Sequence, residues 1–249
     1  MRLGATLVHL SPAPPRPIAA WAKRLAGAGF ESLWVPQVIG RGFLVPDPFV
    51  TLAVAAAVTE RVELGTATVQ VPLHHAADLA HRILSLQQMC GDRLTIGLSP
   101  GSTASDFSAF DRDYASRFRA FTAGVGRLRV ILAHGRDEEV DLAPADLARR
   151  PPLLLGSWGA NVERAAREFD GWLASDLRRT PEQIIAAHTR YRAAGGQRAI
   201  VCAIPLTGDG DLAPTGEKLT RYAEAGFDDA IVLIGPAGPQ PEQVRAIFP

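Results

Sequence analysis

The chain has 249 residues, 47% apolar and 21% charged, which is typical of a soluble globular protein with a sizeable core. Its 26 basic and 26 acidic side chains cancel, so the sequence predicts no electrostatic binding to nucleic acid or to an anionic membrane. Two widely separated cysteines, Cys90 and Cys202, argue against a disulfide framework or a zinc module. The N-terminus has no signal-peptide pattern and no apolar run reaches the ~18 residues of a membrane span, so we expect a soluble, cytoplasmic protein.

Apolar runs of strand length alternate with segments of helical period from one end of the chain to the other. Strands are predicted at 3–10, 32–36, 62–69, 93–98, 152–155, 171–174, 199–204 and 230–234. Helices are predicted at 17–28, 47–59, 76–88, 106–133, 161–169, 180–194, 215–225 and from 240 onward, the fourth with a break near Asp111. Asp47 and Thr180, each followed by a proline, are expected to cap their helices.

Eight strands, each followed by a helix, match the element count of a (β/α)₈ TIM barrel, which occupies ~250 residues. The near-continuous apolarity of the strands is typical of parallel strands covered by helices. A doubly wound open sheet is the competing fold, but it usually has a glycine-rich turn after the first strand, where this chain has proline-rich residues 10–14. No linker or low-complexity tract divides the chain, so we predict one α/β barrel domain over residues 1–249.

The loops that follow the strands, where barrel enzymes place their active sites, contain few strong acids, bases or nucleophiles. The only two lysines, Lys23 and Lys218, fall in predicted helices, which excludes a Schiff-base lysine at a strand end. Asp176 is the only well-placed acid, and the adjacent His74 and His75 point ~100° apart on a helix, so we predict neither a metal site nor a carboxylate pair. This composition favours a barrel in which a bound organic cofactor carries the reactivity.

The loop at 155–161 runs from the fifth strand into a helix and contains two glycines and a serine. Backbone N–H groups and the positive end of a helix dipole suit a phosphate there, although an ordinary structural turn would use the same residues. Ser157 and Asn161 are the strongest individual candidates for this contact. A second glycine-bearing turn, 97–102, allows close approach of a flat ring system.

Several stretches, taken in order, resemble the bacterial luciferase-like monooxygenases, a family that includes deazaflavin-dependent oxidoreductases. These stretches are 28–35 (AGFESLWV), 47–53 (DPFVTLA), 59–66 (TERVELGT), 73–76 (LHHA), 91–97 (GDRLTIG) and 170–172 (DGW). Together they span about residues 20 to 175, so the set is specific although each fragment alone is weak.

The resemblance implies a barrel that binds FMN or the deazaflavin coenzyme F-420 at the carboxyl ends of the strands. The ring would lie against a strand-three bulge at Ala67–Thr68, where deazaflavin members commonly have a cis peptide, and the phosphate would lie at 156–161. The implied cofactor-binding residues are Thr66, Ala67, Thr68, Gln70, Ser99, Gly156, Ser157, Trp158, Gly159, Ala160 and Asn161. Family members are commonly dimers, so a homodimer is expected.

The chain departs from the family at several positions. Gln37 and Val38 stand where many members carry an acid and a histidine, and Ser102 where members often carry a strand-four acid. His74 replaces the usual arginine, and the segment 135–151 is a shortened form of the insertion that precedes strand five. The cofactor scaffold is therefore matched, and the best-known acid and base residues are not.

Histidines are the remaining candidates for a reacting side chain. His9 and His75 are the candidate catalytic residues, and no catalytic residue is assigned. A buried, hydrogen-bonded imidazole is the alternative for His9, and a helix-opening role is the alternative for His75. His9, Gln37 and Ser102 are the predicted substrate-pocket residues.

Ordinary structural roles are expected for several conspicuous side chains. Asp106 and Arg117 are expected to form a loop ion pair of little energetic value. Trp34 is expected in the core, and Trp158 and Trp172 either to line the cofactor loop or to pack.

Three functions remain open at this point. The first is an FMN- or F-420-dependent oxidoreductase or monooxygenase acting on a small organic substrate by hydride transfer or an oxygen-dependent step. The second is a cofactor-binding paralogue without turnover, which Gln37, Val38 and Ser102 motivate. The third is an unrelated phosphate-binding barrel such as an isomerase, which needs a strand-end base that the sequence does not offer.

Overall fold

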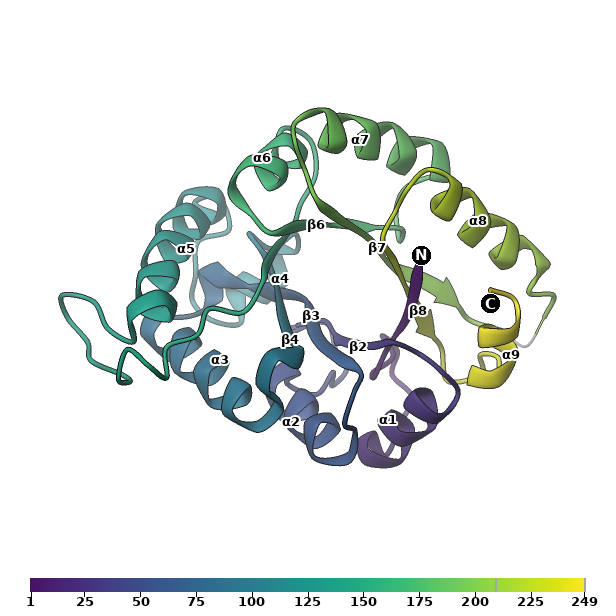
Figure 1. Ribbon diagram of the computed structural model, residues 1–249, viewed down its shortest axis with the longest axis horizontal. Coiled ribbons are helices and arrows are strands. Elements are labelled where there is room, and N and C mark those ends of the chain that lie inside the picture. The colour runs from purple at the N-terminus through teal and green to yellow at the C-terminus, as the bar shows by residue number, and fades with distance from the viewer. Residues whose placement is uncertain (209, 249) are drawn as a thin grey trace.

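Eight parallel strands close into a barrel in the order of the sequence, and helices surround them (Figure 1). The computed structural model describes residues 1–208 and 210–248. The strands are β1 (Arg2–Thr6), β2 (Ser32–Val35), β3 (Glu63–Gln70), β4 (Leu94–Ser99), β5 (Leu153–Gly156), β6 (Gly171–Ser175), β7 (Arg198–Leu206) and β8 (Asp229–Ile234). The pairing of β1 with β8 closes the sheet, which confirms the predicted (β/α)₈ barrel and excludes the doubly wound sheet.

The helices begin where the sequence supplies caps. Asp47 accepts hydrogen bonds from the N–H groups of Phe49 and Val50, and Thr180 forms a capping box with Gln183, so both predicted caps are confirmed. The α-helices are α1 (Ile18–Gly27), α2 (Pro48–Val58), α3 (Ala76–Cys90), α4 (Ala104–Ser108), α5 (Arg117–His134), α6 (Asn161–Glu168), α7 (Pro181–Ala193), α8 (Ala213–Glu224) and α9 (Pro241–Ala246). Two 3₁₀ turns, Val71–Leu73 and Gly91–Arg93, flank α3.

Two elements differ from the sequence prediction. The first strand ends at Thr6 rather than at residue 10, because the chain leaves the sheet toward a segment with four prolines, at 12, 14, 15 and 17, which have no N–H for a strand ladder. The helix predicted at 106–133 with a break near Asp111 is two helices, α4 and α5, so the break is confirmed, but it extends over residues 109–116. Asp111 between them has a φ of 51°, a left-handed conformation that a helix cannot continue through. Asp113 then accepts hydrogen bonds from the N–H groups of Ala115 and Ser116, just before α5 begins.

The barrel interior is filled by a small cluster of buried side chains from β2 and from β5 to β8. Its members are Trp34, Leu154, Leu173, Ile200, Cys202 and Ile231. Trp34 is fully buried, as expected, and it requires a glycine beside it, since a Cβ on Gly65 would lie 2.2 Å from the indole ring. A larger apolar cluster fills the layer between the strands and the helices. The resulting core holds the strand ends in fixed positions.

Charged side chains gather at the amino ends of the strands. Glu63 of β3 accepts two hydrogen bonds from Arg198 of β7, each 2.8 Å long, and one from Thr95 at 2.6 Å. Arg198 also donates to Asp229 of β8 at 2.8 Å, and Arg2 forms ion pairs with both acids. Burial alone would raise the pKa of Glu63, but the hydrogen bonds from Arg198 and Thr95 lower it below its usual range. This network ties five strands together, β1, β3, β4, β7 and β8.

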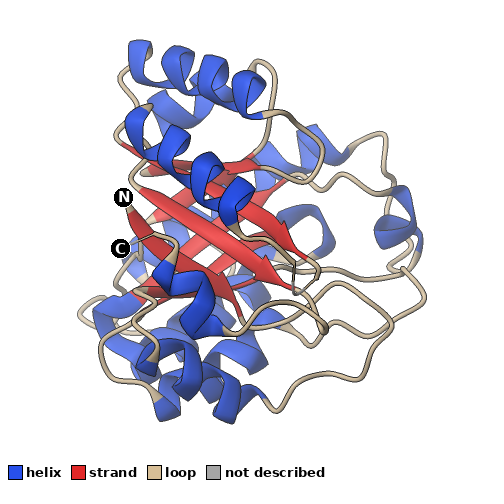
Figure 2. Cartoon of the chain, turned by 90° about the vertical axis from the view of Figure 1, so that its right-hand side faces the viewer, coloured by secondary structure: helices blue, strands red, loops and turns tan. Residues whose placement is uncertain are grey.

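The loops that follow the strands gather at the end of the barrel opposite the two termini (Figure 2). The shortened segment before β5 projects to the side of α5 instead of covering that end (Figure 1). Gly135 ends α5 in a left-handed conformation with a φ of 72°, which turns the chain outward. Within the described residues, none of the helices combines the length and the apolarity needed to cross a membrane.

Candidate active site

A cavity of about 450 Å³ lies at the carboxyl ends of the strands, and residues from or just after all eight strands line it. Its floor contains Leu173, Cys202 and Ile231, which also belong to the interior cluster of the barrel. The described lining residues include no aspartate, glutamate, histidine or lysine, but they include four arginines, Arg41, Arg117, Arg178 and Arg179. The remaining polar lining groups are neutral hydrogen-bonding groups, so the wall of the cavity is cationic.

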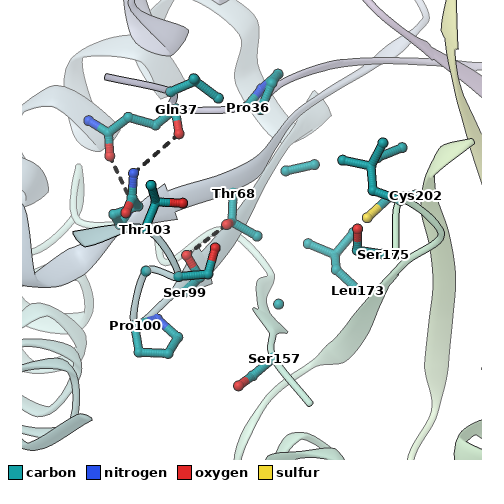
Figure 3. Close-up of a pocket in the computed structure, with 18 of the residues that line it drawn as sticks. Pro36, Gln37, Thr68, Ser99, Pro100, Thr103, Ser157, Leu173, Ser175 and Cys202 are labelled. Carbon is teal, nitrogen blue, oxygen red and sulfur yellow. Dashed lines mark hydrogen bonds between the residues drawn. The ribbon is translucent and has the colours of Figure 1, made fainter. Parts of the chain in front are cut away.

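One wall of the cavity is formed by an irregularity in β3. The register between β3 and β4 shifts between Thr66 and Val69, and the Ala67–Thr68 peptide is cis. Ala67 and Thr68 consequently face the cavity, and the Thr68 hydroxyl donates to Ser99 Oγ at 2.8 Å (Figure 3). Thr66 does not reach the cavity, because it is fully buried and donates to the carbonyl of Gly97 at 2.9 Å.

A buried polar network supports the same wall. Gln37 accepts a hydrogen bond from the Gln70 N–H at 2.9 Å, and the Gln70 side-chain amide donates to Asp106 at 2.8 Å. Asp106 is fully buried and pairs with Arg41 at 2.9 Å. The sequence-based pairing of Asp106 with Arg117 is therefore wrong. Arg117 instead lies over the rings of neighbouring aromatic residues, 4.0 Å from the Tyr114 centroid and 4.4 Å from that of Phe118.

Three lining residues carry a buried polar atom that has no partner within the described part of the chain. These atoms are Thr6 Oγ1, Gln70 Oε1 and Arg117 Nε. The Gln70 amide orientation is fixed, because its nitrogen donates to Asp106 and to the Gln37 carbonyl. Buried polar atoms without partners are rare in folded proteins, and three of the ten such atoms among the described residues belong to side chains that line this cavity.

The glycine-bearing loop after β5 contributes its first half to the cavity. Gly156, Ser157 and Trp158 line it, whereas Gly159, Ala160 and Asn161 do not. A Cβ on Gly156 would lie 2.4 Å from the Thr68 methyl group, so only glycine lets β5 approach the bulge in β3. Asn161 begins α6, whose positive end faces this loop.

Trp158 and Trp172 take different roles. Trp158 lines the cavity, while Trp172 is fully buried and donates from Nε1 to the Ser157 carbonyl at 3.1 Å. Trp172 therefore holds the loop in place from behind.

The two candidate catalytic histidines lie outside the cavity lining. His9 is buried, and its ring nitrogens lie 3.1 Å from the Pro14 carbonyl and 2.9 Å from Ser11 Oγ. His75 is exposed at the start of α3, with Arg127 3.3 Å from its Nε2. Of the three predicted substrate-pocket residues, Gln37 and Ser102 line the cavity and His9 does not.

The acid at the end of β6 also turns away from the cavity. Asp176 accepts hydrogen bonds from Tyr222 at 2.5 Å and from Lys218 at 3.0 Å, both on α8. It is absent from the lining and anchors α8 to the barrel. His74 instead interacts with Gln37, with 2.9 Å between the two side-chain nitrogens. Burial, and then the charge of Arg82, lower the pKa of His74.

Several lining residues were missed by the sequence reasoning. Arg41, Arg179 and Tyr114 come from the loops after β2, β6 and β4, and Cys202 comes from β7. Burial, and then the nearby Asp176, raise the pKa of the Cys202 thiol to about 12, so it stays protonated at neutral pH. The sequence did offer one signal for this cationic wall, because arginines follow β2, β4 and β6, whose carboxyl ends lie at the same end of the barrel.

Comparison with known proteins identifies relatives of the whole barrel. The family model for luciferase-like monooxygenases matches residues 2–230. The 4-hydroxyprotoasukamycin monooxygenase of Streptomyces nodosus subsp. asukaensis is 34% identical over 123 residues, which cover 47% of this chain and 33% of that enzyme. The match thus spans about a third of that relative's length.

Two solved structures share the fold at low sequence identity. An F-420-dependent secondary alcohol dehydrogenase in complex with an F-420–acetone adduct has a TM-score of 0.72 at 15% identity, covering 93% of this chain and 92% of that one. The oxygenating constituent of 3,6-diketocamphane monooxygenase from Pseudomonas putida, in complex with FMN, has a TM-score of 0.69 at 15% identity, covering 92% of this chain and 80% of that one.

Proposed function

Because the chain belongs to the luciferase-like monooxygenase family, we propose that it is an oxidoreductase that binds FMN or F-420 in this cavity and acts on a small organic molecule. The relatives and neighbours include a monooxygenase, a dehydrogenase in complex with an F-420 adduct and a monooxygenase in complex with FMN, which supports this class of activity. The names of these relatives do not identify the substrate of this chain.

The observation that carries the proposal is a cavity at the carboxyl ends of the strands whose described lining combines arginines with neutral hydrogen-bonding groups and includes no carboxylate, imidazole or lysine amine. Thr6, Gln70 and Arg117 each present a buried polar atom without a partner among the described residues. A tricyclic ring with several carbonyl and N–H groups, carrying a phosphate side chain, has complementary donors and acceptors. Its ring fits beside Ala67 and Thr68, and its phosphate beside Ser157 and the positive end of α6.

The residues of the chain would bind and orient rather than exchange protons. When bound, the reduced cofactor supplies the electrons, either as hydride or to oxygen. Gln70, held by Asp106, fixes an acceptor at the cavity wall, and Thr68 and Ser99 provide hydroxyl groups beside the bulge. The floor of Leu173, Cys202 and Ile231 excludes water from below.

The cofactor-binding paralogue without turnover stays a second candidate. It is favoured by the cavity lining, in which the described residues include no carboxylate, imidazole or lysine amine to act as a general acid or base.

Titration of the purified full-length protein with FMN and with F-420, followed by fluorescence, tests the proposal. We expect at least one to bind at micromolar concentration, and failure of both would overturn the proposal. Binding with NAD(P)H- or oxygen-linked turnover supports the enzyme, whereas binding without turnover of any small-molecule panel supports the paralogue.

A charge placed in the loop 156–161, which we call the phosphate loop, makes the test specific for this site. Ser157→Asp is expected to weaken FMN binding by about tenfold or more through repulsion of the phosphate, and to change riboflavin binding little. Thr189→Asp on the exposed face of α7 is the matched control. Equal losses for FMN and riboflavin would remove the phosphate from this loop.

A further inference from the structure

Arg178 and Arg179, in the loop after β6, place two positive charges at the cavity. Arg179 is held in place because its guanidinium lies 3.9 Å from the ring centroid of Trp158 in the neighbouring loop. Within residues 1–208 and 210–248, neither guanidinium forms a salt bridge or donates a hydrogen bond. Burial, and then the charge of Arg178, lower the pKa of Arg179.

Many other arginines of this protein are paired with a carboxylate, unlike Arg178 and Arg179. Arg41, for example, lines the same cavity but is neutralised by Asp106 at 2.9 Å. Two consecutive arginines without a carboxylate partner in the described chain repel each other, and this repulsion is relieved when an anion binds between or beside them. The pair therefore marks an anion-binding position on the β6 side of the phosphate loop.

A charge count shows that one phosphate does not use this position fully. The amino end of α6 is equivalent to about half a positive charge, and Arg117, which opens α5 after β4, is a further cation of the lining. These charges largely balance the phosphate monoester of FMN, which ends the molecule. Arg178 and Arg179 then remain as two further charges of the lining, and they follow β6, which lies on the other side of β5 from β4 in the barrel.

We propose that Arg178 and Arg179 form a subsite for carboxylates that continue from the cofactor phosphate, and that the cofactor is consequently F-420 rather than FMN. F-420 has a phosphodiester followed by a chain of carboxylates, whereas FMN has no group beyond its phosphate. The half-buried Arg179 contacts the first part of this chain, and the exposed Arg178 meets the part that leaves the cavity. This inference rests on the proposed function, because it assigns the cofactor of the same site.

Four probes separate the parts of the cofactor: F-420, its deazaflavin core without phosphate or carboxylates, FMN and riboflavin. Dissociation constants are measured by fluorescence titration of the full-length protein. The wild type is expected to bind F-420 more tightly than FMN. Arg178→Gln/Arg179→Gln is expected to weaken F-420 binding about tenfold or more, FMN binding less than about threefold, and the two phosphate-free probes not at all.

Three further variants control for charge and for folding. Arg61→Gln/Arg167→Gln removes the same net charge from exposed positions that do not line the cavity, and it should leave all four affinities unchanged. Arg178→Gln alone alters an exposed side chain without a described partner, so it should fold normally and weaken F-420 binding alone. Arg179→Lys keeps the charge and should retain most of the F-420 affinity. The F-420 affinity of the wild type should also fall more steeply with salt than that of the double variant.

Two results would overturn the subsite. One is tighter binding of FMN than of F-420 by the wild type, which leaves the proposed function standing with the other cofactor. The other is an equal loss of FMN and F-420 affinity in the double variant, which would make the arginines contacts of the phosphate alone. If none of the four probes binds, the proposed function fails together with the subsite.

Discussion

Asp106 is the residue on which the polar wall of the cavity depends. Its fully buried carboxylate accepts from Arg41 and orients the Gln70 amide, whose oxygen is one of the unsatisfied atoms. Asp106→Asn removes the negative charge and allows the Gln70 amide to rotate. We expect a loss of about 2 kcal/mol in the free energy of unfolding, because a buried pair is broken while the Arg41 side chain stays partly in water.

Urea unfolding of Asp106→Asn measures this loss, and a cofactor titration measures the effect on Gln70. Asp92→Asn is the matched control, since the ion pair between Asp92 and Arg149 is 3.5 Å long and largely exposed, and its removal should not change stability. An Asp106→Asn protein as stable as the control, with unchanged cofactor affinity, would contradict the role assigned to Asp106.

The placement of single residues was only partly predictable from the sequence. Ser99 at the end of β4 and Ser157 just after β5 face the cavity, because the barrel topology gathers the carboxyl ends of the strands there. Thr68 faces it through the irregularity in β3. His9 is at a strand end too, but the chain has already left the sheet there, and the ring turns back to the Pro14 carbonyl. The partners of Asp106 were not predictable, because they depend on how the loops after β2 and β4 meet.

At the scale of elements, the close approach of β5 to the bulge in β3 shapes the site. Gly156→Ala would place a Cβ 2.4 Å from the Thr68 methyl group. We expect a loss of about 1–3 kcal/mol in stability from this overpacking, together with weaker cofactor binding because Thr68 is displaced. Thermal unfolding and a cofactor titration measure the two effects.

Relief of the clash provides the internal control for that prediction. Thr68→Ser removes the methyl group that the new Cβ meets, so the double variant Gly156→Ala/Thr68→Ser should recover most of the lost stability. Gly27→Ala, at the end of α1 with nothing within 4 Å of the added carbon, should be neutral or slightly stabilising. Strictly additive losses in the double variant would show that another contact is responsible.

Element types were predictable because apolar runs of strand length alternate with segments of helix length along the whole chain, whereas element ends were not. The break predicted near Asp111 is confirmed, but its extent over residues 109–116 was not predicted. The left-handed Asp111 and the hydrogen bonds that Asp113 accepts from Ala115 and Ser116 set this extent, and neither changes the apolar pattern. The division matters for the site, since the linker between α4 and α5 contributes Tyr114, and Arg117 and Phe118 open α5. A continuous helix would carry these residues elsewhere.

At the scale of the whole molecule, the charged network at the amino ends of the strands should make stability depend on pH. The pKa of Glu63 is lowered in the folded protein, so its contribution is fully present above its unfolded pKa of ~4.3 and is lost as the pH falls through the lower folded value. Glu63→Gln should therefore lower the free energy of unfolding at pH 7 by about 3 kcal/mol, since Arg198 and Arg2 lose a buried partner.

Chemical unfolding of wild type and Glu63→Gln at pH 7 and near pH 3 tests this sign. The difference between the two proteins should shrink at the lower pH, because protonation of the Glu63 carboxylate in the unfolded state favours unfolding once the pH is below its unfolded pKa. Glu242→Gln, which removes an exposed pair with Arg24, should show no measurable difference at pH 7. If the difference in free energy of unfolding between wild type and Glu63→Gln grows as the pH falls, the predicted pH dependence of the Glu63 contribution is wrong.

We expect a homodimer in which the face of α2 that points away from the barrel forms the interface. This helix has no charged residue, and Val50 and Val54, one turn apart, are 65% and 37% exposed. Leu44, just before the helix, is 73% exposed. A helix that is apolar on every side is normally covered, and an uncharged face pairs well with a copy of itself across a two-fold axis.

Val50→Glu/Val54→Glu should convert a dimer into a monomer without loss of fold, as measured by light scattering and circular dichroism. Ala186→Glu on α7, across the barrel from α2 (Figure 1), should leave the mass unchanged. A wild-type protein that is monomeric at tens of micromolar, or a double variant that stays dimeric, would rule out this face as the interface.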